Sequence, residues 1–201
     1  MVLVCWLHGQ AAADMVTFDI SVPNRQLSSF TGPYGKVEVT ADGTGPATIT
    51  LTRVDPSSPY FFCDSHIFAI NPSIDATVSD PNLAWKAKPG DSKKPNVTKV
   101  AAGNVSEFGY FPIVFKNFDG PGAGVISISF TLKPISGSFA DAASVLKANN
   151  EGYFAAAHIY PPDGSLSGFA GVQVPLPGAL LLLGAGLVRL VAYSRRKRAL
   201  A

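Results

Sequence analysis

Charged side chains are scarce in this sequence. Asp, Glu, Lys and Arg make up only 15% of the 201 residues, whereas hydrophobic residues reach 47%. Such an apolar chain can bury enough surface to fold, so we do not expect disorder. Between Asp14 and Gln173 there are 11 basic and 14 acidic residues, a net charge of about −3. Nucleic-acid-binding domains concentrate positive charge, and we therefore expect no nucleic-acid partner.

Residues that bind transition metals or act as nucleophiles are also few. The sequence contains two cysteines, Cys5 and Cys63, and three histidines. A zinc site needs three or four clustered His and Cys ligands. The closest thiol–imidazole pair is Cys63 and His66, and residues three apart on a strand point to opposite faces. We therefore expect no catalytic residues, no metal ligands and no cofactor, and we predict that the protein is not an enzyme.

Calcium is the one metal that the sequence leaves open. Carboxylate and amide side chains, whose oxygens are calcium ligands, are frequent in the predicted turns: Asp75, Asp80, Asn82, Asn117 and Asp119. None of their spacings matches a dedicated calcium loop, and Asp and Asn form turns for stereochemical reasons of their own. Turn formation is therefore our first interpretation, and a bound calcium ion is the alternative.

The N-terminal segment has features of a secretory signal peptide. A short apolar run, residues 2–7, is followed by the small residues Ala11, Ala12 and Ala13. A basic start is missing and the run has about six residues rather than 7–15, as a start codon assigned too far downstream would produce. We predict a partial signal peptide over residues 1–13, the alternative being a frayed soluble terminus. Cleavage after Ala13 leaves Cys63 as the single cysteine.

Alternation of apolar and polar residues predicts an all-β domain. Hydrophobic residues occupy every second position in four segments, 16–22, 36–40, 47–53 and 125–132. This period is typical of strands with one buried and one exposed face. Clusters of Gly, Pro, Asn and Asp separate the segments. We predict an antiparallel β-sandwich, jelly-roll-like, over residues 14–171.

Three further segments are strand-like without clear alternation: 60–70, 109–115 and 152–160. Pro112 cannot donate to a strand ladder, so it places its segment at a sheet edge or a bulge.

One segment has helical spacing instead. Ser138 is a suitable N-cap, Gly152 supplies a stop, and the apolar residues between them follow a helical period: Phe139, Ala142, Ala143 and Leu146. We predict one short helix over residues 139–148.

Aromatic residues raise the possibility of a sugar-binding surface. The apolar segments contain Phe61, Phe62, Phe108, Tyr110, Phe111, Tyr153, Phe154 and Tyr160. Aromatic side chains are usually buried, so we expect most of them to fill the core. A row of three coplanar exposed rings would instead favour a carbohydrate-binding module, with or without calcium.

The C-terminal region has the composition of a short membrane anchor. Residues 178–188 are apolar and uncharged, Arg189 interrupts, and residues 190–193 continue the run. A helix over residues 178–194 would span about 25 Å, slightly less than a ~30 Å hydrocarbon core. The basic end predicts a cytoplasmic C-terminus and an external domain: Arg195, Arg196, Lys197 and Arg198. The alternative is a buried final helix of the sandwich.

A family resemblance covers about the last 28 residues. An apolar span containing Gly-Ala-Gly-Leu (184–187) and a basic end follow the motif Val174, Pro175, Leu176 and Pro177. In this order the features resemble the PEP-CTERM class of bacterial sorting tails, and most closely the VPLPA-CTERM variant. Gly178 stands where that variant usually has Ala, and Arg189 lies in a span that is usually uncharged.

The resemblance implies a sorting signal over residues 172–201, with the motif at 174–177 and the basic end at 195–198. An exosortase, a membrane-embedded processing enzyme, would cleave at or near the motif. We therefore expect an exported surface or extracellular-matrix protein, made as a single-pass inner-membrane precursor with its domain outside. Extracellular polysaccharide is an expected partner, because bacteria with such tails commonly make it. An extracellular carbohydrate-binding module is the alternative function.

Overall fold

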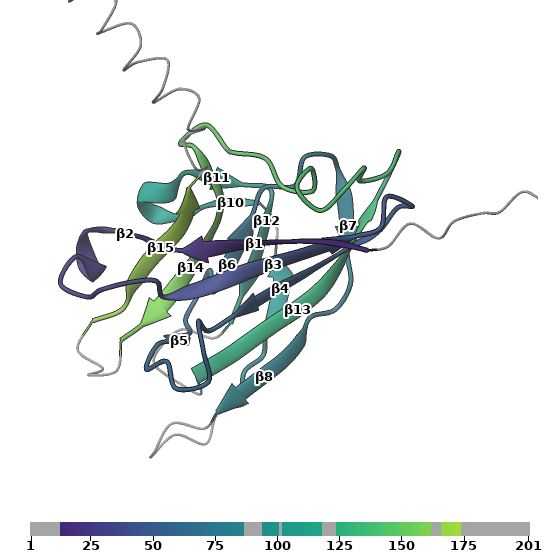
Figure 1. The fold of residues 1–201 in the computed structure, drawn as a ribbon. Coiled ribbons are helices and arrows are strands. Elements are labelled where there is room, and N and C mark those ends of the chain that lie inside the picture. The colour runs from purple at the N-terminus through teal and green to yellow at the C-terminus, as the bar shows by residue number, and fades with distance from the viewer. Residues whose placement is uncertain (1–12, 87–93, 101, 118–123, 162–165, 174–201) are drawn as a thin grey trace, which may run out of the picture.

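The fold consists of antiparallel strands, with two short 3-10 helices. A computed structural model describes residues 13–86, 94–100, 102–117, 124–161 and 166–173 (Figure 1). The pairings between these strands are antiparallel. In chain order the elements are β1 (Asp14–Ile20), β2 (Val22–Pro23), η1 (Arg25–Leu27), β3 (Gly35–Ala41), β4 (Ala47–Thr52), β5 (Phe61–Phe62), β6 (Phe68–Ile70), β7 (Ala76–Val78), β8 (Asn82–Lys86), β9 (Thr98–Val100), β10 (Gly103–Asn104), η2 (Ser106–Phe108), β11 (Tyr110–Phe111), β12 (Ile113–Lys116), β13 (Gly124–Pro134), β14 (Tyr153–Tyr160) and β15 (Gly168–Gln173).

One layer contains β1, β3, β4 and β13 side by side in that order. The other edge of β13 pairs with β7 and β8. Burial alternates along β3 and β4, where Val37, Val39, Ile49 and Leu51 are fully buried between more exposed neighbours. The predicted alternation is confirmed in these strands, because one face lies on the core and the other faces solvent.

The second layer contains β2, β15, β14, β6, β12 and β9. Apolar side chains from both layers form the main core cluster. Phe62 of β5 pairs with Val125 of β13 and with Ile159 of β14, so hydrogen bonding continues from one layer to the other. In Figure 1, β14 and β15 cross the direction of β3 and β4. The prediction of an all-β, sandwich-like fold is confirmed at this level.

The central strands of the second layer, β6 and β14, are buried on both faces. Ala155 and Ala157 of β14 belong to the main core, whereas Ala156 packs into a second cluster with Phe108 and Phe111. All three alanines are fully buried. Because the segment containing η2 covers the outer face, β14 has no solvent-facing side and its sequence shows no alternation.

Residues 60–70 do not form the single strand that we predicted. β5 and β6 are separated by a turn in which Asp64 and His66 adopt φ values of 68° and 60°. Left-handed backbone ends an extended strand, and Asp and His tolerate it better than branched residues do. The predicted strand over residues 16–22 is also divided, since β1 pairs with β3 whereas β2 pairs with β15.

The predicted helix over residues 139–148 is wrong. This segment forms turns and an isolated bridge between Pro72 and Leu146. Asp141 and Ser144 exchange hydrogen bonds through side chain and backbone, which offers the chain an alternative to helical bonding. The apolar residues of the segment still reach the core: Phe139, Ala142, Val145 and Leu146 are all buried.

The remaining differences between the predicted and the observed strands concern Pro112 and several short strands. Pro112 lies at a bend that separates β11 from β12, and β12 pairs on both sides, with β6 and β9. We expected a sheet edge or a bulge at Pro112. Instead, the chain passes there from one sheet to another, because β11 pairs with β10 in a separate two-stranded sheet and β12 belongs to the large sheet. Our prediction did not include β7, β8, β9 and β15.

Candidate functional site

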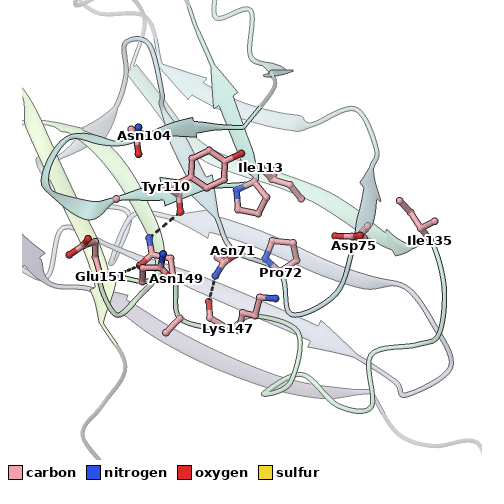
Figure 2. Close-up of a pocket in the computed structure, with 15 residues that line it drawn as sticks. Asn71, Pro72, Asp75, Asn104, Tyr110, Ile113, Ile135, Lys147, Asn149 and Glu151 are labelled. Carbon is pink, nitrogen blue, oxygen red and sulfur yellow. Dashed lines mark hydrogen bonds between the residues drawn. The ribbon is translucent and has the colours of Figure 1, made fainter.

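A polar groove lies beside the 3-10 helix η2, and the described residues form all of its lining. Its cavity volume is about 740 Å³. Its walls come from three parts of the chain, residues 71–76, 104–113 and 135–151. Figure 2 shows Tyr110 and Asn104 across from Asn149 and Lys147, with Pro72 between these two sides. Such a volume lies within the range of natural ligand sites.

The side chain of Asn149 holds one wall of the groove together. Its Nδ2 donates to the carbonyl oxygens of Phe108, at 2.7 Å, and Tyr110, at 3.3 Å. Its Oδ1 accepts from the backbone nitrogens of Glu151, at 3.1 Å, and Tyr153, at 3.0 Å. One amide therefore connects β11 to the turn before β14, and its hydrogen-bonding capacity is largely used inside the protein.

Asn71 joins the floor to the opposite wall. Its side chain is buried and donates to the carbonyl oxygen of Lys147 at 3.0 Å, while its backbone oxygen accepts from the Lys147 nitrogen at 2.9 Å. The Lys147 ammonium donates to the carbonyl oxygen of Ser73 at 3.2 Å. These bonds keep residues 71–76 and 145–149 together without regular secondary structure.

Several polar side chains along the groove remain open to a ligand. Asn104, Asn150, Glu151 and Asp75 are exposed, and within the described part of the chain their side chains make no hydrogen bond or ion pair. Tyr110 is 57% exposed. Amides donate and accept, carboxylates accept, and a tyrosine ring offers a flat apolar face. This set can hold a polyhydroxylated ligand.

A second cluster lies at the turn between β5 and β6. The Nδ1 atom of buried His158 is 3.7 Å from Oδ2 of Asp64, and its ring stacks on Phe169 with centroids 4.3 Å apart. Burial lowers the pKa of His158 below its ordinary value of 6.5, and the Asp64 carboxylate acts in the opposite direction. Cys63 is buried in a tight turn rather than on a strand.

The candidate calcium residues are dispersed. Asp75 lines the groove, Asp80 and Asn82 lie at the connection of β7 and β8, and Asn117 accepts a hydrogen bond from the Asn96 nitrogen. Asp119 is outside the described residues. Within the described ranges, no group of three or more His, Cys, Asp or Glu is placed to hold a metal ion.

The candidate aromatic side chains divide between the core and the surface. Phe62, Phe108 and Phe111 are fully buried, whereas four others are partly exposed: Phe61, Tyr153, Phe154 and Tyr160. The exposed rings among the described residues are Trp85, at 38%, and Tyr110. Trp85 is on β8 and Tyr110 on β11, which are at opposite ends of the body in Figure 1. The described residues therefore do not contain a row of three exposed rings, the arrangement that would have favoured a carbohydrate-binding module over a surface protein.

The predicted sorting residues fall outside the described part of the chain. This holds for the motif at 174–177, the span at 178–194, the basic end at 195–198 and the signal segment at 1–12. Among the residues that the structure describes, no helix has the length and hydropathy needed to cross a membrane.

Nothing in the sequence indicated that the residues of the groove lie close together. Tyr110 was one of eight candidate aromatic residues, and Asn149 came directly after the predicted helix over residues 139–148. Their contact depends on bonds between segments about forty residues apart, for which no local pattern gives a signal.

Comparisons with protein-family models, curated proteins and solved structures found no match. The fold and the groove define an all-β antiparallel protein with a polar, open concave surface.

Proposed function

We propose that this chain is an exported bacterial surface or extracellular-matrix protein without catalytic activity of its own. Its β-sandwich body, jelly-roll-like in arrangement, is carried on a C-terminal sorting tail. In this proposal residues 178–194 cross the inner membrane once, with residues 195–198 on the cytoplasmic side. An exosortase-like enzyme processes the chain at or near residues 174–177. The body then reaches the cell surface or the extracellular space.

The order of features in the tail carries this proposal. The Val-Pro-Leu-Pro motif, the apolar span and the basic cluster follow one another between residues 174 and 198. The start of the first strand supports it, because β1 begins at Asp14, directly after the small-residue site, and cleavage at that site would leave the strand intact.

The test follows the chain in a bacterial host that contains an exosortase. We expect the full chain to be recovered outside the cytoplasm with a mass reduced by about that of the tail. A variant carrying Pro175→Ala and Pro177→Ala should accumulate unshortened in the membrane. The same double change at Pro56 and Pro59, two exposed prolines outside the motif, serves as the control for substitution itself. A full-length product in the cytoplasm would contradict the proposal.

The groove favours a second function, binding of extracellular carbohydrate. The supporting observation is the combination of exposed Tyr110 with unpaired amide and carboxylate side chains around one concave surface. Sugar-binding sites need a flat apolar surface for the ring and polar groups for the hydroxyls. The two functions are compatible, since an exported body can bind a matrix glycan.

A further inference from the structure

We propose that the groove binds an uncharged glycan chain, with the ring of Tyr110 as the stacking platform. This inference rests on the carbohydrate-binding function and adds the place of binding and the class of sugar. Three features of the described residues carry it. They are the support beneath Tyr110, the distribution of unpaired polar groups and the sign of the charges along the groove.

The ring of Tyr110 is exposed on a supported backbone. Its neighbour Phe111 is fully buried, Phe108 of η2 is 1% exposed, and both pack in the second core cluster. The Tyr110 carbonyl accepts from Asn149, and β11 pairs with β10 at Asn104 and Tyr110. The backbone is therefore anchored on the side away from the ring. An exposed aromatic ring on a fixed backbone loses little entropy when a sugar ring stacks on it.

Unpaired polar groups flank this ring. Figure 2 shows Asn104 close to Tyr110, Glu151 on the opposite wall, and Asp75 towards the far end near Ile135. Sugar hydroxyls donate to carboxylates and both donate to and accept from amides. Because the polar groups extend along the groove away from the ring, the geometry fits several consecutive sugars rather than one.

The charges favour an uncharged sugar. Glu151 and Asp75 supply two carboxylates, and Lys147 is the one cation among the described residues that line the groove. Its ammonium is held by the Ser73 carbonyl. A polyuronate would bring its carboxylates towards Glu151 and Asp75, two anions that the single Lys147 cation offsets only in part, which costs binding energy. Neutral glycans avoid this repulsion.

The test measures retention of the purified full chain on immobilised or gel-embedded polysaccharides. The probes are neutral glucans (dextran, laminarin and cellulose), a neutral mannan, and alginate as the polyuronate. We expect retention by at least one neutral glycan and none by alginate. Retention should change little between about 0.05 and 0.5 M NaCl, because no ion pair is formed.

Variants locate the site. Tyr110→Ala should weaken retention about tenfold, whereas Tyr110→Phe, which keeps the ring, should stay within about threefold of the parent. Trp85→Ala removes the other exposed ring, on β8, and is the matched control that should change nothing. Circular dichroism of each variant confirms that the fold is retained.

Each outcome supports or overturns a specific statement. Failure of all glycans to retain the chain overturns both the carbohydrate-binding function and this inference. Retention that is lost in Trp85→Ala but kept in Tyr110→Ala leaves the function standing and overturns the groove as its site. Retention by alginate alone, or retention abolished by salt, overturns the uncharged class.

Discussion

His158 is a buried titratable residue on β14. Its backbone pairs with Ile67 and Cys63, and its ring lies between Phe169 and the Asp64 carboxylate. Its Nδ1 atom has no hydrogen-bond partner in the described part of the chain. Burial opposes a positive charge here more than Asp64 favours it, so the folded protein holds the neutral imidazole.

Stability should therefore depend on pH through His158. The folded-state pKa lies below the ordinary value of 6.5, so the unfolded chain binds the proton more readily. The contribution of neutral His158 to the free energy of unfolding is complete above pH 6.5. It decreases as the pH falls from 6.5 towards the folded-state pKa. We expect the urea midpoint to decrease between pH 7.5 and about pH 5.5.

His158→Gln is the variant that isolates this effect, since glutamine does not titrate. Its midpoint should vary less over the same pH interval than that of the parent. In Asp64→Asn the counteracting carboxylate is gone, so the decrease should be steeper. Equal pH dependence in the parent and in His158→Gln would show that the burial of His158 does not contribute.

At the scale of elements, Gly171 of β15 leaves room for the side chains of the second core cluster. A Cβ atom at Gly171 would lie 2.6 Å from Cδ1 of Phe108 and 2.8 Å from Cδ1 of Tyr153. These two rings pack edge to face, with centroids 4.8 Å apart. The absence of a side chain at Gly171 thus lets η2 lie directly on the sheet.

Gly171→Ala should destabilise the fold by roughly 1–3 kcal/mol, because the rings must move to make room for the methyl group. Chemical denaturation followed by tryptophan fluorescence or circular dichroism measures the change. Gly103→Ala is the matched control on another strand, since its Cβ would meet nothing closer than 3.7 Å. If both variants unfold at the parent midpoint, the packing of Phe108 on β15 is looser than described.

The strands that could be predicted from the sequence are those with one face in solvent. β3, β4 and β13 have partly exposed outer residues such as Glu38, Thr50 and Ser129, and their alternation is visible in the chain. β6, β12 and β14 lie between two apolar clusters, so their residues give no period. The helical spacing of residues 139–148 was misleading, because Val145 and Leu146 reach the core from a turn that is bonded to Asn71 and Ser73.

At the scale of the whole molecule, β15 is the strand that completes the second layer. It pairs with β14 along six positions and with β2 at Ala170 and Gly171. Ala170 and Val172 are buried in the main core. The body therefore needs the chain up to β15.

Residues 14–173 should consequently fold by themselves. We expect a cooperative urea transition for this fragment, whereas a fragment ending at residue 167 lacks β15 and should not show one. Circular dichroism during denaturation compares the two fragments. A fragment 14–173 that unfolds without cooperativity would mean that the tail belongs to the body, against the proposed processing at residues 174–177.

The sequence alone determined the class of fold and the prediction of where the protein goes. The alternation of apolar and polar residues, and the sequence of motif, apolar span and basic end at residues 174–198, are patterns of neighbouring residues that can be recognised along one chain. Only the tertiary structure decided what the body offers to a ligand. The groove joins residues 71–76, 104–113 and 135–151, and His158 is buried by partners distant in sequence. The physical reason is that burial and long-range hydrogen bonds depend on all the segments that meet at a place.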